Sequence, residues 1–110
     1  MFATKNRLSK QKDFEKIFKN GKTINGGFFK IFYIKNSLNN NRFSIIVGKK
    51  ISKIAVVRNH IKRLIRKEIE KYNFKSNNLD FIFIVFPIYK TKKFDIPNDI
   101  KTALAKIFIY

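Results

Sequence analysis

Residues 42–72 have the sequence RFSIIVGKKISKIAVVRNHIKRLIRKEIEKY, and this stretch decides the expected fold. Its first part, 42–48, is rich in apolar and β-branched side chains, which is typical of a strand. In 55–72, apolar side chains recur at intervals of three and four, which predicts a long amphipathic helix. Further along, 80–86 reads DFIFIVF and predicts a strand that is covered on both faces. Together these segments predict a β-α-β unit.

Two more helices are expected at the two ends of the chain. The first spans about 9–19, with Ser9 as its N-cap and Gly21 in the left-handed conformation after its last turn. The last helix has Pro97 in its first turn. Its apolar stripe consists of Ile100, Leu104 and Ile107.

A third strand is expected at 28–34, which reads FFKIFYI. The segment 36–41, NSLNNN, has a turn composition, so 28–34 and 42–48 are predicted to pair as a hairpin. The resulting order, α-β-β-α-β-α around a small central sheet, indicates an α+β sandwich. With 110 residues, the chain is expected to form a single domain, 1–110, with a basic tail at 1–8.

The charge of the chain indicates a polyanionic partner. Lys and Arg number 25 against 7 Asp and Glu, a net charge of +18. Self-repulsion on this scale destabilises a small domain unless a polyanion binds it. Cysteine is absent, which excludes disulfides and cysteine metal sites and fits a reducing compartment. A cytoplasmic location is therefore expected, and no apolar run has the length of a membrane span.

Arginine is the more informative cation, because its planar fork matches phosphate. The five arginines are Arg7, Arg42, Arg58, Arg63 and Arg66. One side of the 55–72 helix is expected to carry Arg58, Asn59, Lys62, Arg63 and Arg66. The opposite side is expected to face the core through Val57, Ile61, Leu64, Ile65 and Tyr72. Cations gathered on one face repel each other, which favours a phosphate-binding face over a merely solvated one.

The loop before this helix offers a second place for phosphate. It contributes Lys49, Lys50 and Lys53, together with backbone amides and the helix N-terminus. No nucleotide-binding glycine pattern accompanies it.

Aromatic residues supply a different kind of nucleic-acid surface. Along 28–34, Phe28, Lys30 and Phe32 are expected to share one face of the strand. Aromatic rings stack on any base and lysine follows the backbone, a combination that suits single strands. The alternative is that aromatic residues such as Phe14, Phe18 and Phe28 belong to the core.

Catalysis by the protein itself is not expected. His60 is the only histidine, so a paired-histidine acid–base site is impossible. The acidic residues are scattered and form no metal-binding motif. Neither a catalytic nor a metal-binding residue is therefore assigned.

The stretch 48–68, GKKISKIAVVRNHIKRLIRKE, resembles the signature of bacterial ribonuclease P protein components. In that family a Ser-Lys-Lys segment leads into an Ala-Val-x-Arg-Asn-Arg helix. Asp13-Phe14, Phe18 before the Gly21 turn, and Asp80-Phe81 match the family in the same order.

This resemblance implies a two-layer α+β sandwich with a left-handed β-α-β crossover. It also implies a protein subunit that is not catalytic alone. The catalytic RNA subunit, with Mg²⁺ held mainly by RNA, would remove the 5′ leader of precursor tRNA. Neither an organic cofactor, nor a membrane, nor an obligate protein partner is implied. RNA-subunit contacts are expected at Lys49, Lys50, Lys53, Arg58, Asn59, His60, Lys62, Arg63 and Arg66. A leader-binding cleft is expected at Phe14, Phe18, Lys30 and Phe32.

Three departures from the family pattern stand out. His60 replaces the third motif arginine, and histidine carries less charge near neutral pH. Gly48 stands where the family usually has serine, and Ser52 stands where it usually has glycine. Phe86 replaces the arginine that often ends the third strand of the family.

Other functions remain as alternatives. A general RNA-binding module, such as a ribosomal protein or an RNA chaperone, would bind RNA without affecting precursor-tRNA cleavage. A self-sufficient nuclease would need no RNA subunit. A DNA-binding helix is disfavoured because helix-turn-helix spacing is missing.

Overall fold

Four strands pair into one sheet over the residues that the structure describes, 7–72, 74, 78–90 and 93–107 of a computed structural model. The strands are β1 (Lys22–Asn25), β2 (Phe29–Lys35), β3 (Arg42–Val47) and β4 (Leu79–Val85). The helices are α1 (Gln11–Asn20), α2 (Ala55–Lys71), α3 (Ile96–Ile107) and a 3₁₀ turn, η2 (Pro87–Lys90). The predicted α+β class is confirmed.

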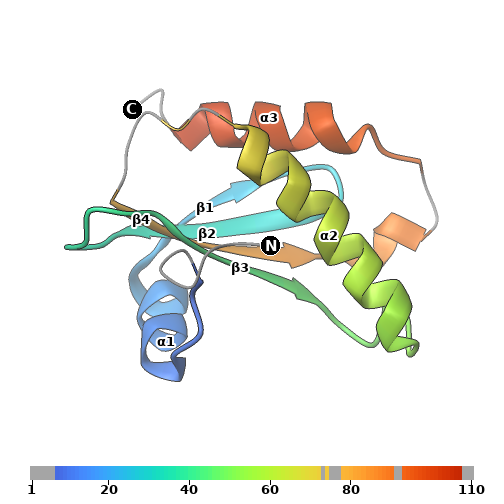
Figure 1. The fold of residues 1–110 in the computed structure, drawn as a ribbon, viewed down its shortest axis with the longest axis horizontal. Coiled ribbons are helices and arrows are strands. Elements are labelled where there is room, and N and C mark those ends of the chain that lie inside the picture. The colour runs from blue at the N-terminus through green and yellow to red at the C-terminus, as the bar shows by residue number, and fades with distance from the viewer. Residues whose placement is uncertain (1–6, 73, 75–77, 91–92, 108–110) are drawn as a thin grey trace.

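Strand β4 lies at the centre of the sheet, whose order is β1-β2-β4-β3. It pairs antiparallel with β2 and parallel with β3. Six of its seven residues are buried, which agrees with the prediction of a strand covered on both faces. The parallel pair β3 and β4, joined by α2, forms the predicted β-α-β unit (Figure 1).

The predicted hairpin of 28–34 with 42–48 is wrong, because β4 separates β2 from β3. The intervening 36–41 loop instead bonds to the start of β4. Asn36 donates its backbone N–H to Asn78 O at 2.7 Å, and Leu79 donates its own to Asn41 Oδ1 at 2.9 Å. A turn composition predicts a change of direction but not which strand lies alongside.

The short edge strand β1 was not predicted. Its sequence, KTIN, has a single apolar residue, Ile24, and a run of four residues carries little pattern. Tertiary pairing makes it a strand, since Ile24 lies opposite Ile31 of β2.

The two faces of the sheet carry different helices. Helices α2 and α3 cover one face, and α1 packs on the other (Figure 1). The larger core lies under α2 and α3, where the predicted Ile100, Leu104 and Ile107 are buried. The smaller core consists of Ile17 with Leu8 and Ile82.

Helix α2 enters the core one turn later than predicted. Ile61 and Ile65 are buried as expected, but the third buried position is Ile69. Val57 is 40% exposed, because it lies in the first turn of α2 beside the exposed Val56. Leu64 and Tyr72 are half-buried.

The ends of α1 differ from the prediction. Lys10, rather than Ser9, occupies the N-cap position and makes no side-chain cap hydrogen bond. Gly21 has φ −74°, so it is not left-handed. It is needed for space instead, since a Cβ there would lie 2.4 Å from Ile17 O.

The predicted basic tail, 1–8, is partly integrated into the fold. Arg7 forms a parallel bridge with Phe43, and Leu8 N–H donates to Phe43 O at 2.9 Å. Leu8 is buried, while residues 1–6 lie outside the described residues. Among the helices described, none has the length and apolarity to cross a membrane.

Candidate nucleic-acid interface

The predicted RNA-subunit contacts all lie on α2 and the loop before it, and they divide by exposure. The exposed residues are Lys49, Lys50, Lys53, Asn59, His60 and Arg63. The half-buried residues are Arg58, Lys62 and Arg66, spaced four apart along α2. This half-buried row lies next to the buried row of α2. The three residues therefore do not lie opposite the core, contrary to the prediction.

Arg58 anchors the basic loop to the helix. Its Nη1 donates to the backbone oxygen of Ser52 at 2.9 Å. The Ser52 hydroxyl accepts the Ile54 N–H at 3.2 Å just before α2 begins. A Cβ added at Gly48 would meet nothing within 4 Å, so a side chain would fit there as well. Ser52 does not have a positive φ, so its backbone does not require glycine.

Lys62 and Arg66 line a pocket of about 270 Å³ at the edge of β3. The N-terminal segment brings Arg7 and Ser9 to the same pocket. Sequence reasoning singled out Arg7 but could not place it, because the bridge between Arg7 and Phe43 joins segments far apart in the chain. The basic residues therefore form two groups, an exposed one and one at the β3 edge.

The four residues of the predicted leader-binding cleft come together where α1 meets β2, and we call them the aromatic patch: Phe14, Phe18, Lys30 and Phe32. The rings of Phe18 and Phe32 meet edge to face, with centroids 5.0 Å apart. Lys30 Nζ lies 5.3 Å from the centre of the Phe32 ring, in cation–π range. Phe14 and Phe32 pack against the smaller core. Phe18 remains 44% exposed, so its ring has surface left for a ligand.

Phe28 does not belong to this face. It is 0% exposed and packs against the rings of Phe29, Tyr89 and Phe94 in the larger core. Strand β2 begins only at Phe29, so alternation does not extend back to Phe28. For this residue, the core alternative was correct.

The face that carries the aromatic patch remains apolar beyond α1. Ile46 of β3 lies opposite Ile84 of β4, which in turn lies opposite Lys30 of β2. Ile46 is 36% exposed, and Phe86, directly after β4, is 38% exposed. Among the described strand residues of this face, the cations are Lys30 and Arg42.

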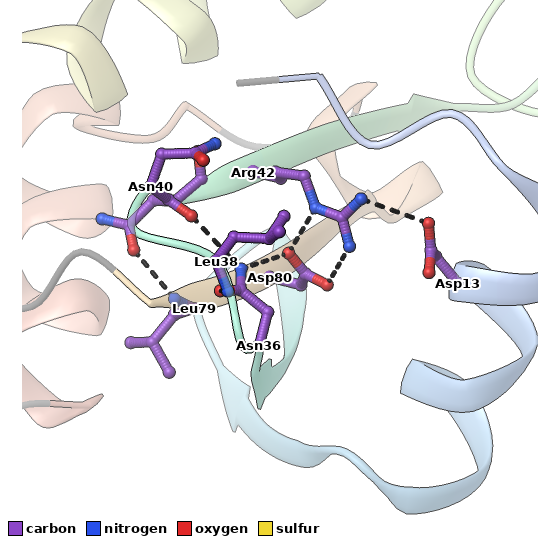
Figure 2. Close-up of polar contacts among 8 residues, drawn as sticks. Asp13, Asn36, Leu38, Asn40, Arg42, Leu79 and Asp80 are labelled. Atoms are coloured by element: carbon purple, nitrogen blue, oxygen red, sulfur yellow. Dashed lines mark hydrogen bonds and ion pairs between the residues drawn. The ribbon is translucent and has the colours of Figure 1, made fainter. Parts of the chain in front are cut away.

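Arg42 is bound inside the protein (Figure 2). Its Nε and Nη2 donate to the two carboxylate oxygens of Asp80 at 2.8 and 2.7 Å. Its Nη1 donates to Asp13 Oδ2 at 3.3 Å. The hydrogen bond to Asp80 raises the pKa of Arg42 above its ordinary value, so the guanidinium stays charged. Sequence reasoning gave Arg42 no particular role and missed this network.

No cluster of three or more His, Cys, Asp or Glu side chains suited to a metal ion occurs among the described residues. Asp80 illustrates why, since its Oδ1 also accepts Asn36 Nδ2 at 2.7 Å. Its oxygens are therefore already occupied by donors from Arg42 and Asn36.

A cationic helix on one face of a small mixed sheet and an aromatic patch on the other define the class of protein. It is a small basic α+β protein with the charge and the stacking surface of a nucleic-acid-binding protein.

Comparisons with known proteins identify the family. A family model described as Ribonuclease P matches residues 2–108. The ribonuclease P protein component of Dictyoglomus turgidum is 35% identical over 108 residues, covering 97% of this chain and 89% of that protein. That of Syntrophomonas wolfei is 38% identical over 85 residues, covering 77% and 71%.

Solved structures show the same fold. The Staphylococcus aureus RNase P protein superimposes with a TM-score of 0.83 at 28% identity, covering 96% of this chain and 97% of that one. The Thermotoga maritima RNase P protein gives 0.74 at 25% identity, covering 92% and 93%. The chain therefore belongs to the ribonuclease P protein family, the protein components of a tRNA-processing nuclease.

Proposed function

We propose that this chain assists a catalytic RNA in removing the 5′ leader of precursor tRNA by holding two RNAs at once. The exposed basic residues of α2 and its preceding loop bind the RNA subunit. The aromatic patch binds the leader as a single strand. The complex works in the cytoplasm.

The observation that carries this proposal is the position of the aromatic patch relative to α2. The patch lies on the α1 face of the sheet, whereas α2 covers the opposite face. Two surfaces with different chemistry on opposite faces do not compete for one ligand. Phosphates favour the cations of α2, and unpaired bases favour the exposed ring of Phe18.

The chemistry of cleavage is assigned to the RNA. His60 is exposed on α2, and Asp13 and Asp80 are engaged by Arg42. No group of three or more His, Cys, Asp or Glu side chains suited to a metal ion occurs among the described residues. We assign the Mg²⁺ to the RNA phosphates, and the protein contributes binding and orientation.

Directed cleavage can map the two surfaces, because the natural chain has no cysteine. An iron chelate would be attached to a single introduced cysteine. Asn25→Cys lies beside Lys30 in the sheet register, and Lys67→Cys is exposed on α2. Lys101→Cys, exposed on α3, is the control.

We expect Asn25→Cys to cut the leader and Lys67→Cys to cut the RNA subunit in the assembled complex. The Lys101→Cys derivative should cut the leader weakly or not at all. Leader cuts from Lys67→Cys but not from Asn25→Cys would contradict the proposal. A chain that binds RNA without any leader cuts would be a general RNA-binding module instead.

A further inference from the structure

Helix α1 carries two members of the aromatic patch and packs on the sheet mainly through apolar side chains. Ile17 is its one fully buried residue. Its N-cap residue, Lys10, makes no side-chain hydrogen bond to the first turn. The tilt of α1 over the sheet therefore depends on its side-chain contacts with the sheet.

A charged contact is present at the first turn of α1. Asp13 lies there and accepts a hydrogen bond from Arg42 Nη1 at 3.3 Å. The side chains of Arg42 and Asp13 are 19% and 26% exposed, so the pair is only partly solvated. Asp13 thus adds a charged tie to the apolar contacts that Phe14, Ile17 and Phe18 of α1 make with the sheet.

The other end of this contact is rigid. Asp80 is the second residue of the central strand β4 and is 4% exposed. It receives two hydrogen bonds from Arg42 and one from Asn36 (Figure 2). A bidentate arginine–carboxylate pair fixes the orientation of the guanidinium plane. Arg42 therefore presents Nη1 to α1 in a defined direction.

The tie at Asp13 bears on the position of Phe18. The two residues lie five positions apart on α1, about 7.5 Å along the helix axis. A change of tilt at the first turn moves Phe18 relative to Phe32. The centroids of the two rings are 5.0 Å apart in the structure. Small displacements matter here, because base stacking needs the ring at a defined distance.

We propose that Asp13, Arg42 and Asp80 form a clamp that positions α1, and thereby Phe18, for leader binding. Arg42 is then a positioning residue that does not touch RNA. This inference rests on the proposed leader-binding function. It also explains why an arginine in this strongly basic chain is turned towards two carboxylates.

The test compares Asp13→Asn with Glu15→Gln in the complete ribonucleoprotein. Both changes remove one negative charge from α1. Glu15, however, is exposed and accepts a hydrogen bond from Gln11 of the same helix at 3.1 Å. The measured quantity is the affinity for precursor tRNA divided by the affinity for mature tRNA.

We expect Asp13→Asn to lower this ratio about two- to fivefold, because the amide oxygen can still accept the Arg42 hydrogen bond and the charge attraction is lost. Glu15→Gln should change it less than about twofold. In a Phe18→Ala background, Asp13→Asn should have no further effect, because the clamp acts through Phe18.

Several results would overturn the clamp. One is an equal effect of Asp13→Asn and Glu15→Gln on the affinity ratio. It would mean that the loss of a negative charge on α1, and not the contact with Arg42, changes leader binding. Another is an Asp13→Asn effect that persists in full in the Phe18→Ala background, which would indicate a general structural role. A wild-type complex that does not distinguish precursor from mature tRNA would overturn the proposed function as well.

Discussion

Truncation of Phe18 to alanine separates leader binding from folding. The Phe18 ring is 44% exposed and contacts the Phe32 ring at its edge. An aromatic pair of this kind contributes about 0.5–1.5 kcal/mol. The truncation should therefore lower the melting temperature by about 2–12 °C, at about 4–8 °C per kcal/mol for a domain near this size.

The expected effect on binding is larger. A base stacked on an aromatic ring contributes about 1–3 kcal/mol. Phe18→Ala should therefore weaken precursor tRNA binding by about 5- to 150-fold. Mature tRNA lacks the leader, so its affinity should change little. Both affinities would be measured with the complete ribonucleoprotein at one salt concentration.

Phe28→Ala is the matched control. The same side chain is removed, but Phe28 is 0% exposed among three other rings. Its loss should cost about 3–5 kcal/mol of folding free energy with no selective effect on precursor tRNA. A leader-binding role for Phe18 would be contradicted if Phe18→Ala destabilises the fold as much as Phe28→Ala does. It would also be contradicted if Phe18→Ala weakens the binding of both tRNAs equally.

Further predictions concern charge and backbone space. Arg63→Glu should weaken RNA-subunit binding and lower its salt slope by about one unit, whereas the same change at Lys101 on α3 should leave the slope unaltered. The precursor-to-mature affinity ratio should fall with salt with a slope of no more than about one phosphate contact, since Lys30 is the cation of the aromatic patch. A steeper slope would show that the leader is bound mainly through its phosphates and not its bases. Gly21→Ala should destabilise the fold by about 1–3 kcal/mol in thermal unfolding, because its Cβ would lie 2.4 Å from Ile17 O; an unchanged melting temperature would show that α1 shifts freely.

Local patterns predicted the elements that are long and strongly periodic. The α2 helix and the β4 strand follow directly from the apolar pattern of 55–72 and 80–86. Strand pairing could not be read in the same way, because the partner of β3 lies beyond a helix in the sequence. The hairpin was predicted from a turn composition that only reports a loop.

The sequence predicted which kinds of residue form the candidate site better than it predicted where these residues lie in the fold. The family resemblance grouped Phe18 with Phe32, and the structure brings their rings together. Strand alternation wrongly placed Phe28 on the same face, since its burial depends on where β2 begins. The ion pairs of Arg42 were not predicted, because its carboxylate partners lie 29 and 38 positions away.

We expect the protein to act through an RNA subunit. The most direct measurement is removal of the 5′ leader from precursor tRNA at low Mg²⁺, with the purified chain and its cognate ribonuclease P RNA together and with each omitted in turn. We expect cleavage that requires the RNA and is strongly stimulated by the protein. Tight binding without stimulation, or cleavage by the protein alone, would contradict the account.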